Sequence, residues 1–81
     1  MESSKSMLIH GVNWMPTPAF AVDAEGRIIA WNRWMQELTE TEAADVVGLA
    51  ESECAIPFHG DRNPVYDAQG QTIGAVVKVE A

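Results

Sequence analysis

The sequence predicts one small acidic α+β domain, and three observations carry that prediction. The chain has 81 residues, which is too few to divide into two separate cores. Apolar residues make up 47% of it and charged residues 21%, a composition typical of folded globular proteins. Runs with strand character and runs with helix character then follow one another, separated by Asp-to-Gly turns and by prolines.

A flexible lead-in is expected over residues 1–13, followed by a compact domain over residues 14–81. Apolar and polar residues alternate loosely in the second half of the lead-in, which allows a short helix or strand there. Pro16 and Pro18 then interrupt regular structure, because each proline lacks a backbone donor and restricts the residue before it.

The first hairpin is predicted from two apolar runs, residues 19–22 and residues 27–31. Asp23 and Gly26 bound the four-residue turn between them. An aspartate side chain can accept hydrogen bonds from backbone N–H groups ahead of it, and glycine adopts the positive φ that closes such a turn. The pattern therefore favours two paired strands.

Two short helices are expected next. Asn32 is a good N-cap residue, because its side-chain oxygen can accept a hydrogen bond from the first helical turn. Good helix formers follow over residues 33–39. A second helix is predicted to begin at Thr41 and to end at Gly48, which serves as its C-terminal cap.

Residues 49–63 carry the weakest pattern in the chain. A short helix is allowed over residues 50–55, whereas Pro57 and the sequence His59-Gly60-Asp61 favour a loop.

The last hairpin shows the clearest alternation. Val65 and Tyr66 lead into a turn over residues 67–70 that resembles the first one, Asp-Ala-Gln-Gly against Asp-Ala-Glu-Gly, and this likeness is ordinary hairpin chemistry. A strand follows over residues 72–80. One of its faces is expected to carry the alternating apolar residues Ile73, Ala75, Val77 and Val79.

Charge and cysteine content narrow the function. The net charge is −7, and the five basic residues form no patch, so nucleic acid and anionic membrane surfaces are not expected partners. The single cysteine, Cys54, excludes an internal disulfide and fits a reducing compartment. The N-terminal residues carry no signal-peptide core, and no apolar run is long enough to span a membrane, so a cytoplasmic location is the expectation.

Four motifs in this order resemble the PAS domain family. They are residues 18–29 (PAFAVDAEGRII), the step from Trp31 to Asn32, the pair ELT and VVG within residues 37–48, and residues 63–76 (NPVYDAQGQTIGAV). Together they span nearly all of residues 14–80. The resemblance implies an antiparallel β-sheet flanked by short helices, with sensing, ligand binding or dimerisation as the role.

The chain departs from the family pattern in three places. A usual member has two more helices and a further strand between the positions of Gly48 and Pro64, parts that wall the ligand cavity and contact haem or flavin. Glu40 stands where the family often has glycine, and the chain ends at Ala81 without the usual Asp-Ile-Thr exit. The sequence therefore resembles a compact or truncated PAS domain taken from a longer signalling protein with a downstream signalling domain.

No cofactor or metal site is predicted. His59 lacks the helix on which haem-binding members carry histidine, and His10 is the other imidazole. Cys54 lies between Glu53 and Ala55 rather than in the Asn-Cys-Arg motif of flavin-binding members. Cys54 and His59 give two of the four ligands that a structural zinc needs.

The three tryptophans divide between core and surface. Trp31, at a strand end, is expected in the core, whereas Trp34 falls off the apolar face of its helix. For Trp14 and Trp34, core packing and an interface role are both open.

Two functions follow, and neither is catalytic, since no nucleophile–base constellation or phosphate-binding loop is present. The first is a signalling module that forms a homodimer, with exchange of elements between chains as one route; a transmitter to a kinase or chemotaxis output is a weaker variant. The second is a small-molecule sensor with a reduced cavity under the sheet. The cavity candidates are Phe20, Ile29, Trp31, Met35, Leu38, Phe58, Ile73 and Val77.

Overall fold

The computed structural model describes residues 3–54 and 60–79. The candidate residues Phe58 and His59, and the end of the chain after Val79, lie outside the described residues. The elements, in chain order, are α1 (Ser3–Asn13), β1 (Ala19–Asp23), β2 (Ile28–Trp31), α2 (Arg33–Thr39), α3 (Ala43–Val46), the 3-10 helix η1 (Glu51–Glu53), β3 (Gly60–Tyr66) and β4 (Thr72–Val79). In these two ranges no helix has the length and apolar character needed to cross a membrane.

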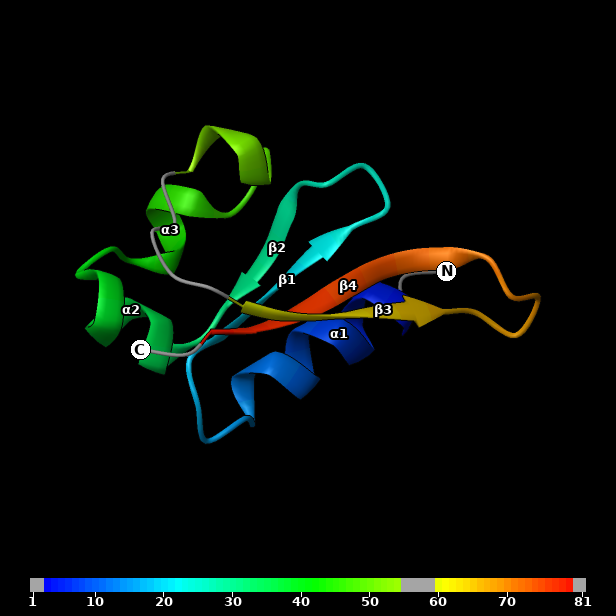
Figure 1. Cartoon of the computed structure of the whole chain (residues 1–81), viewed down its shortest axis with the longest axis horizontal. Helices are drawn as coiled ribbons and strands as arrows, with labels where there is room; N and C mark the ends of the chain where they lie inside the picture. Colours follow the sequence, from blue (N-terminus) through cyan, green and yellow to red (C-terminus); the bar gives the residue numbers. More distant parts are fainter. Residues whose placement is uncertain (1–2, 55–59, 80–81) are drawn as a thin grey trace.

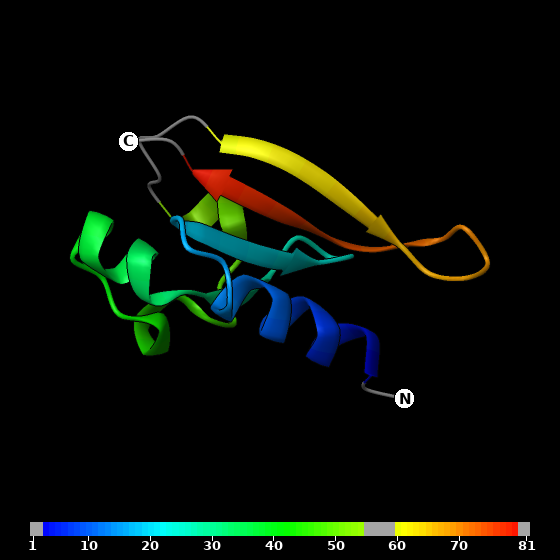
Figure 2. The ribbon, with the colours of Figure 1, turned by 90° about the horizontal axis from the view of Figure 1, so that it is seen from below.

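The four strands form one antiparallel sheet in the order β2-β1-β4-β3 (Figure 1). This is the α+β arrangement that the sequence predicts. Side chains alternate along β1, so that Phe20 and Val22 enter one hydrophobic cluster while Ala19 and Ala21 enter another. The sheet therefore has an α2–α3 face, covered by α2 and α3, and an α1 face, along which α1 runs (Figure 2).

Both predicted turns form, with the same hydrogen bonds. The Asp23 carboxylate accepts from the backbone N–H of Glu25 at 3.0 Å and of Arg27 at 2.9 Å. Asp67 does the same for the residues two and four positions after it, at 2.9 Å each. Each turn closes through a glycine with φ near 80°.

Large side chains fill the α2–α3 face. Phe20 and Ile28 are fully buried there, as is Met35 of α2. The rings of Phe20 and Trp31 lie 5.7 Å apart between centroids, in a tilted arrangement that aromatic pairs favour. Trp31 is 5% exposed, which confirms its predicted place in the core, and Trp34 is 44% exposed, as its position off the apolar face predicts.

The α1 face corrects the expected flexible lead-in. Residues 3–13 form a helix that packs on β1, β2 and β4. Leu8 and Val12, one helical turn apart, are buried against Ala19, Ala21 and Ala30. The alanines leave room for the helix to lie close to the sheet.

Two β-bulges move two predicted cavity residues to the α1 face. The registers of β2 and β4 each contain one extra residue, Ile29 in β2 and Ile73 in β4. A bulge interrupts the alternation of side chains, so strict alternation predicts the wrong face for residues beyond it. Ile29 and Ile73 consequently pack against the cluster under α1, whereas Ala75, Val77 and Val79 stay on the α2–α3 face.

β3 begins earlier than the sequence indicates. Gly60 and Asp61, expected in a loop, are paired with the end of β4. β3 is an edge strand, which is where a proline such as Pro64 is tolerated. Its Arg62 guanidinium forms an ion pair with Glu51, so η1 is held beside the strand.

Candidate functional site

Asn32 connects more elements than any other polar side chain in the described part of the chain. Its Oδ1 accepts from the backbone N–H of Ala19 at 3.2 Å and of Met35 at 3.0 Å. Its Nδ2 donates to the carbonyl oxygens of Val12 at 3.0 Å and Thr17 at 2.8 Å. The side chain is 1% exposed and uses both of its amide protons.

This network ties the two faces of the sheet together at one point. The bond to Met35 is the N-cap that the sequence predicts for α2. The bonds to the last turn of α1 and to the proline-containing loop were not predicted, because nothing in the local sequence indicates which carbonyl groups approach the amide. A displacement of α1 would therefore change the hydrogen bonds that fix the start of α2.

A cavity of about 210 Å³ opens on the α2–α3 face. The indole N–H of Trp31 donates to the carbonyl oxygen of Thr41 at 3.0 Å and holds the α2–α3 connection beside it. Trp31 is the one member of the predicted cavity set, among the described residues, that lines this space. The full lining is Trp31, Thr39, Thr41, Val46, Leu49, Glu53 and Cys54.

The remaining cavity candidates occupy other places. Phe20, Met35 and Val77 are buried in the core of the α2–α3 face, and Leu38 packs against that core. Ile29 and Ile73 lie on the α1 face, as described above. Thr41, Leu49 and Cys54 line the cavity but were missed, because they belong to the connections whose path the sequence does not reveal.

The Cys54 thiol is half-buried at the edge of this cavity. Burial raises its pKa, and the carboxylates of Glu53 and Glu51 raise that pKa further. A raised pKa favours the neutral thiol, so Cys54 is a poor nucleophile at neutral pH. Within residues 3–54 and 60–79, no group of three or more His, Cys, Asp or Glu side chains could hold a metal ion. His59, the zinc and haem candidate, lies outside those ranges.

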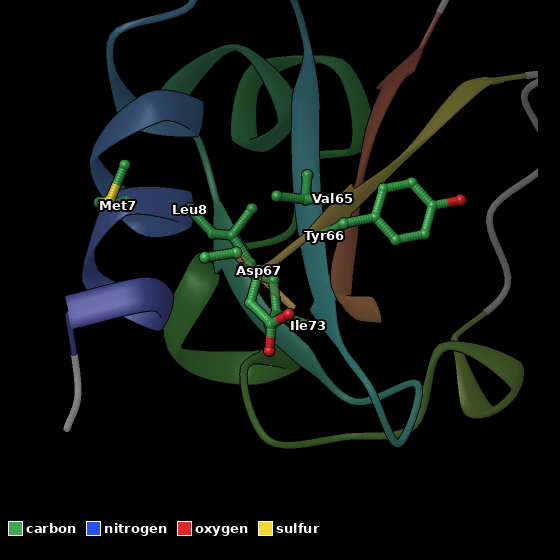
Figure 3. Close-up of a pocket in the computed structure, with 7 residues that line it drawn as sticks. Met7, Leu8, Val65, Tyr66, Asp67 and Ile73 are labelled. Atoms are coloured by element: carbon green, nitrogen blue, oxygen red, sulfur yellow. The ribbon is translucent and has the colours of Figure 1, made fainter. Parts of the chain in front are cut away.

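A second cavity, of about 380 Å³, lies on the α1 face between the first turns of α1 and the β3–β4 hairpin (Figure 3). Apolar side chains supply most of its walls. These are Met7, Leu8, Val65, Tyr66, Ala68 and Ile73. The remaining lining residue is Asp67. Among the predicted cavity residues that the structure describes, Ile73 alone belongs to it.

The chain belongs to the PAS family. Residues 6–53, more than half of the chain, match the family described as PAS fold. The structure of the PAS domain from Bordetella pertussis BvgS is similar to this one, with a TM-score of 0.73 and 17% sequence identity over 95% of this chain and 84% of that chain. That likeness confirms the fold that the resemblance implies.

One curated relative is Halobacterial transducer protein 9 of Halobacterium salinarum. It is 40% identical to this chain over 40 residues, which is 49% of this chain. The aligned segment is 8% of the length of the transducer protein.

Proposed function

We propose that this PAS domain is a non-catalytic sensory module of a signal-transducing protein of the sensor-kinase or chemotaxis-receptor type, and that it acts as a homodimer. Membership of the PAS family and the similarity to a transducer protein support the signalling role. A cytoplasmic location and a downstream output domain are part of the same proposal.

The observation that carries the pairing is a pair of exposed apolar side chains, Met7 of α1 and Trp14 directly after it, which together are called the α1 stripe. Met7 is 73% exposed and Trp14 is 84% exposed. They lie two helical turns apart, so they share one side of the helix, with Gly11 between them. An exposed tryptophan of this kind is typical of the residues that anchor protein interfaces. Burial by a second chain would remove this apolar surface from water.

Exchange of elements between two chains is an alternative way to form a homodimer, with a different contact surface. In that case β3 and β4 of one chain would complete the sheet of the other, and the α1 stripe would stay exposed.

The second candidate function is binding of a small molecule in the cavity beside Trp31 and Cys54. Its volume of about 210 Å³ is smaller than that of typical ligand sites, which begin at about 300 Å³. A ligand of a few heavy atoms fits this space. Such a ligand would raise the melting temperature by mass action, and a Leu49→Trp variant that fills the cavity would abolish that shift.

Native mass spectrometry of the protein as purified tests both functions. We expect the mass of two bare chains at micromolar concentration. Extra mass retained on the monomer or the dimer would favour the ligand-binding function. A strictly monomeric protein at high micromolar concentration would contradict the homodimer.

A further inference from the structure

We propose that the cavity between α1 and the β3–β4 hairpin binds a small organic ammonium ion, with the apolar body of the ligand between the helix and the sheet and its charged nitrogen at Asp67. This cavity lies on the opposite face of the sheet from the cavity beside Cys54. All of its walls come from one chain, so the inference goes beyond the proposed homodimer and does not depend on it.

The walls of the cavity suit a compact apolar group. In Figure 3 the side chains of Leu8, Val65 and Ile73 lie between α1 and the hairpin. Leu8 is 5% exposed, and Val65 and Ile73 are half-buried against the same hydrophobic cluster, so these side chains form a firm wall. The volume of about 380 Å³ falls within the range of about 300–1,000 Å³ that is typical of small-molecule sites.

The rim of the cavity is adaptable on one side and low on the other. Met7 lies at the helix end and is 73% exposed, and an unbranched methionine side chain can adjust to the shape of a ligand. Ala68, exposed at the turn of the hairpin, contributes a single methyl group. The ring of Tyr66 points away from α1 in Figure 3, so the polar contact of a ligand falls to Asp67.

Asp67 supplies the charge of the cavity. Its Oδ1 accepts hydrogen bonds from the backbone N–H groups of Gln69 and Gln71, at 2.9 Å each. Within the described part of the chain, no hydrogen bond uses the second oxygen, Oδ2. The residues that line the cavity include no basic side chain. The second oxygen can therefore accept a charge-assisted hydrogen bond from an ammonium group.

The surrounding charge favours a cation over an anion. The net charge of −7 attracts cations to the surface and repels carboxylates. The positive end of the α1 dipole acts within the first turn of the helix, and this turn ends before Met7. An apolar space with a carboxylate at its rim therefore selects an amine with a hydrocarbon or aromatic body.

The turn itself requires an acceptor oxygen at Asp67 and no charge. Asp23 makes the corresponding hydrogen bonds in the first hairpin, so the bonding pattern belongs to the turn. An asparagine side chain supplies the same kind of acceptor in turns of this type. Asp67→Asn therefore removes the charge from the cavity while it keeps the chemistry of the turn.

Titration with phenethylamine and hexylamine, followed by heteronuclear NMR of the backbone amides, tests the site. We expect the signals of residues 7–8, 65–68 and 73 to shift most. Hydrocinnamate and heptanoate carry the same apolar bodies with a negative charge, and they should bind at least tenfold more weakly. The absence of a saturable shift with either amine, or equal affinity for amines and acids, would overturn the inference.

Variants locate the ligand. Asp67→Asn should weaken the binding of both amines at least tenfold, because the ion-paired acceptor is lost. The matched control is Asp61→Asn, which removes the same charge from an exposed position on the same hairpin and should leave the affinity within twofold. Ala68→Trp, which fills the mouth of the cavity from the turn, should abolish binding, whereas Leu49→Trp, which fills the cavity beside Cys54, should not.

Two results with these variants would contradict the site. An affinity that Asp67→Asn leaves unchanged would overturn the inference. An affinity lowered by Leu49→Trp and not by Ala68→Trp would place the amine beside Cys54 and overturn it as well. Circular dichroism establishes that each variant is folded. Sedimentation equilibrium without ligand separates the two proposals, since a dimer that binds no amine would contradict this inference and leave the proposed homodimer intact.

Discussion

The two faces of the sheet are built in different ways. The α2–α3 face is packed with large side chains, Phe20, Ile28, Trp31 and Met35, under two helices of at most two turns. The α1 face is lined mainly by small ones, Ala19, Ala21 and Ala30, under a helix of three turns. The first face is stabilised by the volume of its buried side chains. The stability of the second face depends on how closely the helix approaches the strands.

This difference shows how a domain of 81 residues can keep a core and still leave large apolar side chains at its surface. The small residues bury the inner side of α1 with few atoms, through Leu8 and Val12. The outer side of the same helix then carries Met7 and Trp14 at the surface. Asn32 joins the two faces, so a displacement of α1 would alter the hydrogen bond at the start of α2.

The largest expected effect is on the α2–α3 face. Phe20→Ala should lower the free energy of unfolding by about 3–5 kcal/mol, because it removes a buried ring and leaves a cavity. Val12→Ala, on the α1 face, deletes fewer atoms and should cost about 1–3 kcal/mol. Urea denaturation of both variants measures the difference. Equal losses would show that volume does not distinguish the two faces.

Asn32→Asp tests the connection between the faces. The variant keeps the acceptor oxygen for Ala19 and Met35 but turns a second oxygen toward the carbonyl groups of Val12 and Thr17. We expect a loss of about 2–3 kcal/mol at pH 7, from repulsion and from lost donors.

The pH dependence of this variant has a definite sign. Burial and the facing carbonyl oxygens should raise the pKa of the new carboxyl group above its unfolded value of about 3.9. Its protonated form can donate one hydrogen bond. The variant should therefore be most stable below the unfolded pKa of about 3.9 and lose stability as the pH rises through the raised pKa. Asn32→Ala lacks the carboxyl group and serves as the control. A loss in Asn32→Asp that does not change between pH 4 and pH 7 would argue against the assigned bonds.

Gly74→Ala tests the close approach on the α1 face. Gly74 has φ 157°, and a Cβ there would strike the carbonyl oxygen of Val22 and lie 3.2 Å from Leu8 Cδ1. We expect a loss of about 1–3 kcal/mol, since strand backbone and helix would both have to move. Gly11→Ala is the control at low protein concentration, because its Cβ would meet nothing within 4 Å and alanine favours the helix. Similar melting temperatures for the two variants would contradict the tight fit.

The smallest expected effect is a gain in stability. Glu40 ends α2 in the left-handed region, with φ 55° and ψ 31°, where a side chain costs energy and glycine does not. Glu40→Gly should therefore stabilise the domain by about 0.5–1 kcal/mol. Glu37→Gly, within the same helix, should instead cost about 1 kcal/mol. Lower melting temperatures for both variants would show that the left-handed cap at Glu40 is not strained.

Local sequence chemistry was enough to predict the hairpins and the start of α2. The turns depend on Asp23, Asp67 and a glycine close to each, and the cap of α2 depends on Asn32, so neighbouring residues determine them. The departure at Glu40 was also visible from the sequence, and the structure gives its physical meaning in the left-handed cap.

The candidate site was harder to predict, because it depends on long-range geometry. The bulges at Ile29 and Ile73 reverse the face on which a residue lies, and only the second has a local signal, the glycine Gly74 inside the strand. The helix over residues 3–13 packs against Ala19, Ala21 and Ala30 of the sheet, a contact that its own sequence does not reveal. The cavity beside Cys54 is walled in part by connections, whose paths follow from packing rather than from propensity.

Sedimentation equilibrium of the wild-type chain beside its Trp14→Ala variant tests the central claim, homodimerisation through α1, most directly. The account predicts a dimer for the wild type at micromolar concentration and at least tenfold weaker association for the variant. Identical association of the two proteins would contradict the α1 contact, and a wild-type monomer at high micromolar concentration would contradict the homodimer itself.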